Sequence, residues 1–114
     1  MTDPRSAAGH VRVETTVDDR AAAERLARAV VEARLVACAQ VGGPITSFYR
    51  WEGEVQADQE WTVVMKTTAA RLDELTARLL DLHPYDEPEV VAVPVTGGSA
   101  GYLAWVSAET GPKT

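Results

Sequence analysis

The chain has 114 residues, a formal net charge of −6 and a single cysteine. This size suits one domain, and the negative charge disfavours a nucleic-acid partner, because phosphate contacts require clustered Lys and Arg. A lone cysteine excludes an internal disulfide framework, and no stretch approaches the roughly 20 apolar residues that cross a bilayer. We therefore expect a cytoplasmic protein of one domain over residues 1–114, without membrane or nucleic-acid partners and with flexible tails at about 1–10 and 110–114.

The first predicted elements are a strand and a helix. Residues 11–17 are β-branched and alternate in polarity, as in a half-buried strand. Asp18 and Asp19 are candidate N-caps for a helix over residues 20–34, in which apolar side chains recur at helical spacing. The helix should therefore bury one face against the strand that precedes it.

A long antiparallel hairpin is predicted next. Residues 36–41 have the small and apolar composition of a buried strand, and the Gly-Gly-Pro segment at 42–44 interrupts it with a bulge or bend. Extended structure resumes over residues 45–51, turns at 52–54 and returns through 60–67.

The last predicted elements are a helix, a strand and a short closing helix. Thr67 or Thr68 can cap the second helix, which His83 ends because a proline follows it. Residues 89–95 predict the last main strand, and residues 100–108 predict a short helix. The second helix carries its apolar stripe on four leucines: Leu72, Leu75, Leu79 and Leu82.

This order of elements, βαββαβ with a terminal helix, predicts an α+β, ferredoxin-like domain. Right-handed crossovers place both main helices on one face of a four-stranded antiparallel sheet and leave the other face bare. An exposed apolar face marks an association surface. The alternative is that the hairpin folds over its own core, but we favour assembly because the arms look too long for one small sheet. The hairpin gathers large apolar side chains in a chain poor in aromatics: Phe48, Tyr49, Trp51, Trp61 and Met65.

Five segments resemble successive signatures of the CutA divalent-cation tolerance proteins. The resemblance covers about residues 11–109, with Gln40 where family members often have Asn. The segments are Leu35-Val-Ala-Cys-Ala, Ser47-Phe-Tyr-Arg-Trp-Glu-Gly53, Lys66-Thr-Thr68, His83-Pro-Tyr-Asp-Glu-Pro88 and Tyr102-Leu-Ala-Trp105.

The resemblance implies a ferredoxin-like subunit in a very stable homotrimer joined through its strands. From the apolar side chains of the hairpin we expect Phe48, Trp61 and Met65 in the trimer interface. The resemblance also implies likeness in architecture to the PII signalling proteins. The family is linked to tolerance of divalent metals such as copper and, in animals, to anchoring of an esterase.

Metal binding has few candidate ligands in this sequence. A closed zinc site takes four ligands, and Cu(I) prefers thiolates, but only Cys38 offers a thiol. Cys38 lies in a small apolar run, which favours a packing role over a metal role. We expect no obligatory cofactor, and at most a weakly bound copper or other divalent cation held by His83 with Asp86 or Glu87. A second histidine, His10, falls in the predicted tail.

A cleft between subunits is the second candidate site. A His83-Pro-Tyr85 corner beside Lys66 and the aromatic Tyr49 and Trp51 would suit a small anion or metabolite. The alternatives are that Tyr85 only packs the helix end and that Lys66 is a solvent-facing charge. A helix C-terminus would also stabilise the cationic form of His83.

Catalysis is not expected, because no activated nucleophile or pair of carboxylates in contrasting environments is evident. Two functions remain open: a trimeric protein of metal tolerance, and a PII-like sensor of an anionic metabolite. A rigid scaffold for an unidentified protein partner is a third reading.

Overall fold

The computed structural model describes residues 9–111. Within them the chain forms four strands and three α-helices, with a single 3₁₀ turn at Ala69–Arg71. The strands are β1 (His10–Val17), β2 (Cys38–Trp51), β3 (Glu54–Thr68) and β4 (Val91–Val95), and the helices are α1 (Arg20–Glu32), α2 (Leu72–Leu82) and α3 (Ala100–Thr110).

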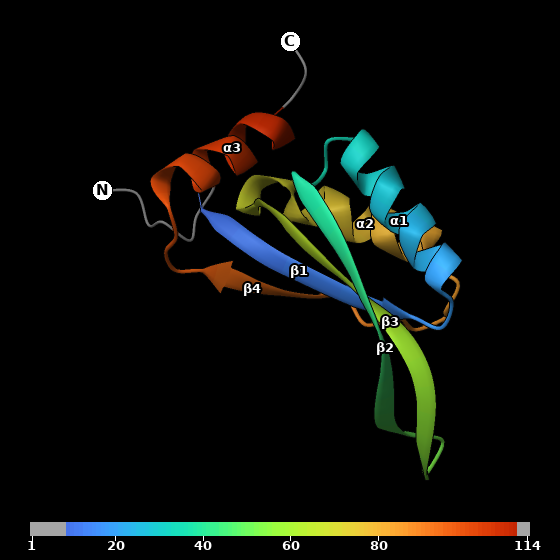
Figure 1. Ribbon diagram of the computed structural model, residues 1–114. Coiled ribbons are helices and arrows are strands. Elements are labelled where there is room, and N and C mark those ends of the chain that lie inside the picture. Colours follow the sequence, from blue (N-terminus) through green and yellow to red (C-terminus); the bar gives the residue numbers. More distant parts are fainter. Residues whose placement is uncertain (1–8, 112–114) are drawn as a thin grey trace.

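The strands form one antiparallel sheet in the order β2-β3-β1-β4. This order and the α+β element sequence confirm the predicted ferredoxin-like fold. Figure 1 shows α1 and α2 together on one side of the sheet, and the β2–β3 hairpin projecting well beyond it. The hairpin tip therefore lacks the helical cover that the rest of the sheet has.

The core lies between the sheet and helices α1 and α2. Asp19 caps α1 as predicted, accepting a hydrogen bond from the Ala22 N–H at 3.2 Å. Met65, predicted in the trimer interface, is fully buried in this core, so that prediction is wrong. Trp61 also packs against the core but stays partly exposed. The buried cluster is Val11, Val13, Val17, Ala23, Leu26, Ala27, Val30, Leu35, Val36, Val63, Met65, Leu75 and Leu79.

The predicted interruption of the hairpin is a β-bulge. The β2–β3 register shifts between Gly42 and Ile45, and the Gly43–Pro44 peptide is cis. Gly43 has a φ of +131°, and a Cβ there would lie 2.9 Å from Trp61 Cδ1. Glycine at 43 thus satisfies both an unusual backbone angle and a close contact with the indole.

Helix α3 lies across one end of the sheet face opposite α1 and α2. His10 Nε2 donates to the Leu103 carbonyl at 2.9 Å, and Cys38 Sγ lies 3.3 Å from the Tyr102 hydroxyl. His10 and Cys38 alternate with core residues along their strands, so their side chains point away from the core. The open face is therefore partly covered by the chain's own last helix.

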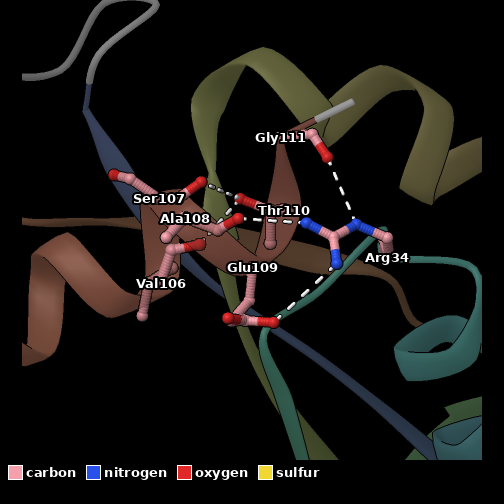
Figure 2. A network of polar contacts seen from close by, with 7 residues as sticks. All are labelled: Arg34, Val106, Ser107, Ala108, Glu109, Thr110 and Gly111. Atoms are coloured by element: carbon pink, nitrogen blue, oxygen red, sulfur yellow. Dashed lines mark hydrogen bonds and ion pairs between the residues drawn. The ribbon is translucent and has the colours of Figure 1, made fainter. Parts of the chain in front are cut away.

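Arg34 fixes the other end of α3, as Figure 2 shows. Its Nη2 donates to the Ala108 carbonyl at 3.0 Å and its Nε to the Gly111 carbonyl at 3.4 Å. Its Nη1 lies 3.8 Å from the Glu109 carboxylate. The guanidinium thus satisfies carbonyl groups that a helix C-terminus leaves without intrahelical partners.

The predicted tails are shorter than expected. His10 begins β1 and Thr110 ends α3, so both belong to regular structure. The remainder of those tail predictions, at 1–8 and 112–114, lies outside the described residues. No helix within 9–111 is long and apolar enough to span a membrane.

Candidate functional site

Three hollows surround Tyr49 in the outer part of the hairpin, and we call their lining the Tyr49 site. Their volumes are about 370, 240 and 380 Å³. The aromatic members are Phe48, Tyr49, Trp51 and Tyr85, and the acidic members are Asp18, Asp58, Glu60, Asp86, Glu87 and Glu89.

Four parts of the fold bring these side chains together. Strand β2 supplies Phe48, Tyr49 and Trp51, and β3 supplies Asp58 and Glu60. Tyr49 pairs with Gln56, so Asp58 lies diagonally across the ladder on the same face. The connection between α2 and β4 supplies Tyr85 and the remaining carboxylates except Asp18, which follows β1. The site therefore depends on the long-range pairing of the hairpin.

Two tyrosine hydroxyls tie the hollows to carboxylates. The Tyr49 hydroxyl donates to the Asp58 carboxylate. The Tyr85 hydroxyl donates to Glu60 Oε2 at 2.8 Å. The hydrogen bond to Asp58 raises the pKa of Tyr49, while burial and the hydrogen bond to Glu60 raise the pKa of Tyr85. Both phenols therefore stay neutral near pH 7 and act as donors.

All charged side chains in the lining are acidic. Glu60 is only 9% exposed, which makes its carboxylate the most buried of the group. Burial, followed by repulsion from Glu14 and Glu60, raises the pKa of Glu89. The described side chains thus create a negative potential around Tyr49 that no lysine or arginine of the lining offsets.

His83 is held by its own chain rather than presented as a ligand. Its Nε2 lies 2.9 Å from the Thr16 carbonyl and 3.1 Å from Thr15 Oγ1. Its Nδ1 accepts a hydrogen bond from the Tyr85 N–H at 3.1 Å. One nitrogen therefore donates and the other accepts, which is the pattern of a neutral imidazole without a free lone pair.

The surroundings of His83 favour its neutral form over the cationic form that a helix C-terminus would stabilise. Burial lowers the pKa of His83, and this effect exceeds the opposing influence of the Thr16 carbonyl and nearby acids. While these hydrogen bonds persist, neither ring nitrogen of His83 is free to bind a metal ion, as had been predicted. Its ring instead lies 4.8 Å from the Tyr85 ring, centroid to centroid, and orients that tyrosine toward Glu60.

The other predicted metal ligands separate into two places. Asp86 and Glu87 line the same hollow as Tyr49, whereas Cys38 contacts Tyr102 near α3. Cys38 is partly exposed rather than buried. Among residues 9–111 no group of three or more His, Cys, Asp or Glu side chains could hold a metal ion. A preformed metal centre is therefore absent from the described part of one chain.

The predicted cleft forms only in part within one chain. Tyr49, Trp51 and Tyr85 share one hollow, as expected. Lys66 lies opposite Cys38 in the sheet, and its Nζ donates to Gln40 Oε1 at 3.1 Å. A cleft that unites Lys66 with the aromatic residues would need two subunits, which stays a prediction.

Sequence reasoning missed several acidic members of the site. None of Asp18, Asp58, Glu60 and Glu89 was predicted to belong to the site. The returning arm was predicted only over 60–67, whereas β3 begins at Glu54 and includes both Asp58 and Glu60. The alternation of these two residues along β3 indicates a shared strand face. The register that places Tyr49 beside them depends on the bulge, which spacing alone does not define.

A larger hollow of about 830 Å³ lies between α1 and the edge strand β2. Its lining includes Arg20, Arg25 and Arg28 from α1 together with Ala39 and Val41 from β2. It contains none of the predicted site residues, so volume alone does not identify the functional region.

The fold and the Tyr49 site define a ferredoxin-like α+β protein with an acidic, aromatic surface and no preformed metal centre in residues 9–111. A family model described as "CutA1 divalent ion tolerance protein" matches residues 11–109. The chain therefore belongs to the CutA1 divalent ion tolerance protein family, as the five signature segments indicated. Membership supports a role in the tolerance of divalent cations.

Individual relatives agree with this assignment. The chain is 44% identical over 96 residues to the divalent-cation tolerance protein CutA of Thermus thermophilus, covering 84% of this chain and 93% of that protein. A solved structure of the Thermus thermophilus protein superimposes with a TM-score of 0.87 at 42% identity, covering 90% of this chain and 99% of that one.

A plant relative is longer. The chain is 43% identical over 98 residues to the chloroplastic protein CutA of Arabidopsis thaliana, a match that covers 86% of this chain. It spans 54% of that protein, so about half of the plant sequence has a counterpart here.

Proposed function

We propose that this protein acts in tolerance to divalent metal ions as a non-catalytic, cytoplasmic homotrimer that binds such ions weakly through exposed carboxylates. The observation that carries the proposal is family membership over residues 11–109. The relative from Thermus thermophilus bears the name divalent-cation tolerance protein, which supports the same role here.

Weak binding follows from the ligands that the described chain offers. Both nitrogens of His83 are occupied, and Cys38 has no second thiol because the sequence holds one cysteine. Asp86 and Glu87 are exposed, line one hollow and supply oxygen ligands. Two flexible carboxylates without further ligands favour fast, weak exchange of a divalent ion over a closed site.

Titration calorimetry with Cu²⁺ and Zn²⁺ on tag-free protein tests direct binding. We expect weak, saturable heat of binding. The double variant Asp86→Asn with Glu87→Gln should lower the fitted metal affinity at least about fivefold. Glu32→Gln, at an exposed carboxylate of α1, is the matched control and should leave the heat unchanged. Absence of heat at millimolar metal, or equal loss in the control, argues against this site.

The trimer is supported by the uncovered hairpin. Phe48 is 73% exposed, Val55 65% and Trp51 53%, which is an unusual concentration of apolar surface for a monomer. Multi-angle light scattering should give three times the chain mass of 12.3 kDa at micromolar concentration. A stable species at the mass of one chain would refute the assembly.

A further inference from the structure

The connection between α2 and β4, residues 83–90, begins with a buried histidine. We propose that this connection opens locally when His83 takes up a proton, while the sheet and the helices stay folded. The opening frees the Tyr85 backbone from the His83 ring and leaves Glu60 without its phenol donor. This response requires no metal ion, so it goes beyond the function proposed above.

The partners of the His83 ring determine which nitrogen carries the hydrogen. Nε2 lies 2.9 Å from the Thr16 carbonyl oxygen, which can only accept, so Nε2 is the donor. Nδ1 lies 3.1 Å from the Tyr85 backbone nitrogen, which can only donate, so Nδ1 keeps its lone pair. Thr15 Oγ1, 3.1 Å from Nε2, is compatible with this assignment because a hydroxyl can accept. The closed connection therefore requires the neutral ring.

A second proton on the ring is incompatible with the closed connection. It can bind only at Nδ1, where the new N–H would face the N–H of Tyr85, and two donors cannot form a hydrogen bond with each other. His83 is only 8% exposed, so water cannot solvate the imidazolium unless the chain moves. Separation of Tyr85 from the ring removes the clash of donors and admits water.

Residues 84–89 have little else to hold them in place. They lie outside the helices and strands, and most of their side chains are exposed. Within the described chain two hydrogen bonds reach this segment, and Tyr85 makes both, one with His83 Nδ1 and one with Glu60 Oε2. Segments with few buried contacts and few hydrogen bonds open at a lower free energy than the elements around them. Loss of one of two hydrogen bonds should therefore open this segment first.

Burial and the surrounding charges act on His83 in opposite directions. Asp18, which follows β1, and Glu60 of β3 favour the cationic ring, but burial outweighs them and lowers the pKa of His83. Exposed Asp81 ends α2 nearby in the sequence, and exposed Arg25 of α1 lines a hollow beside the start of the connection. Opening removes the burial, so the pKa returns toward its ordinary value of about 6.5 and falling pH favours the open state.

Amide hydrogen exchange of the intact protein between about pH 7.5 and 5.5 measures the opening. Protection factors, which are corrected for the pH dependence of intrinsic exchange, should fall roughly five- to tenfold at Tyr85 over this range. Amides of Leu75 and Leu79, two fully buried residues of α2, should change by less than about twofold. The ring nitrogen shifts of His83 should show the Nε2–H tautomer at the upper pH.

Two variants separate His83 from the other titrating groups. The chain has two histidines, and His10 contacts Leu103 of α3, so His10→Gln is the matched control and should leave the response at Tyr85 unchanged. His83→Gln removes both the titrating ring and the acceptor for the Tyr85 N–H. In this variant the Tyr85 amide should be weakly protected at the upper pH already, and its protection should fall less than about twofold further.

Three results overturn the proposal. One is a protection factor at Tyr85 that does not change over this range of pH. Another is an equal loss of protection at Leu75 and Leu79, which would indicate global unfolding. The third is the same pH response in His83→Gln as in the parent, which would assign the opening to the carboxylates.

Discussion

His83 illustrates how its neighbours determine what a residue does. Its ring accepts a hydrogen bond from the Tyr85 backbone and donates toward the Thr16 carbonyl, so both nitrogens serve the junction between α2 and β1. Burial favours the neutral form and lowers the pKa of His83 below its ordinary value. A histidine that looks like a metal ligand in the sequence thus acts as a structural connector.

This environment predicts a pH dependence of stability. As pH falls below the unfolded-state value of about 6.5, the unfolded chain binds a proton that folded His83 resists, so stability decreases. His83→Gln keeps a donor toward Thr16 but does not titrate. At pH 8 the variant should be about 1 kcal/mol less stable than the parent, because it loses the hydrogen bond from Tyr85. Between pH 7 and 5, however, its free energy of unfolding should fall by less than that of the parent.

Urea unfolding at several pH values measures both effects. The quantity to compare is the slope of the unfolding free energy against pH, parent minus variant. Identical slopes would show that His83 takes up its proton equally in the folded and unfolded chain. Other titrating groups cancel in this comparison because both proteins carry them.

At the scale of elements, the bulge of β2 is the feature that the hairpin depends on. It changes the register by which the outer hairpin pairs, and it places Gly43 against the Trp61 indole. The outer arms beyond it carry Tyr49 and Asp58, whose hydrogen bond helps to shape the Tyr49 site. Local backbone geometry at one glycine is thereby coupled to a site further along the hairpin.

Gly43→Ala should be strongly destabilising. Its φ of +131° is unfavourable for an L-residue, and the added Cβ would lie 2.9 Å from Trp61 Cδ1 and 3.1 Å from the Glu60 carbonyl oxygen. We expect a loss of roughly 2 to 4 kcal/mol in urea unfolding. Gly97→Ala, where a Cβ would meet nothing within 4 Å, should change stability by less than about 0.5 kcal/mol. Similar losses at both positions would contradict the account of Gly43.

Helix α3 depends on a single arginine at its C-terminal end. Arg34→Ala removes the hydrogen bonds to the Ala108 and Gly111 carbonyls. Amide exchange should accelerate by roughly fivefold or more over residues 100–110, corresponding to about 1 kcal/mol, while α1 stays protected. Arg78→Ala, at an exposed position of α2, is the control. Unchanged exchange in α3 would mean that its other contacts suffice to hold it.

Much of this architecture could be predicted from sequence, because alternation and helical spacing identify elements and crossover handedness limits their arrangement. The Asp19 cap and the interruption near Gly43 follow from local chemistry alone. The Met65 assignment failed because hydrophobicity does not reveal which sheet face a strand residue occupies. Both Lys66 and Tyr85 were expected beside the aromatic side chains of the hairpin. Only the three-dimensional structure shows that Tyr85 shares a hollow with them, whereas Lys66 contacts Gln40.

At the scale of the whole molecule, a substitution in the exposed hairpin can distinguish a monomer from a homotrimer. In a monomer, Phe48→Glu changes a side chain that is already 73% exposed, so stability should hardly change. In a homotrimer joined through the hairpin, the same change would bury a carboxylate in an apolar interface, which is costly without a partner.

We therefore expect Phe48→Glu to lower the mass measured by light scattering and to lower the thermal midpoint by several degrees. The midpoint of the parent should rise with protein concentration, because assembly stabilises the folded chain by mass action. Leu80→Glu, at a 50% exposed position of α2, is the control for adding charge to an apolar surface. Equal behaviour of the two variants would place the interface elsewhere.

The sheet order has a consequence for the chain as it is being synthesised. β1 is translated first but occupies an inner position, with β3 on one side and β4 on the other. Its second edge stays unpaired until Val95 has left the ribosome, and the contact of His10 with Leu103 comes later still. A nascent chain therefore carries an open strand edge through most of its translation. Completion of the sheet coincides with the emergence of its last segments, and holdase chaperones have that interval in which to act.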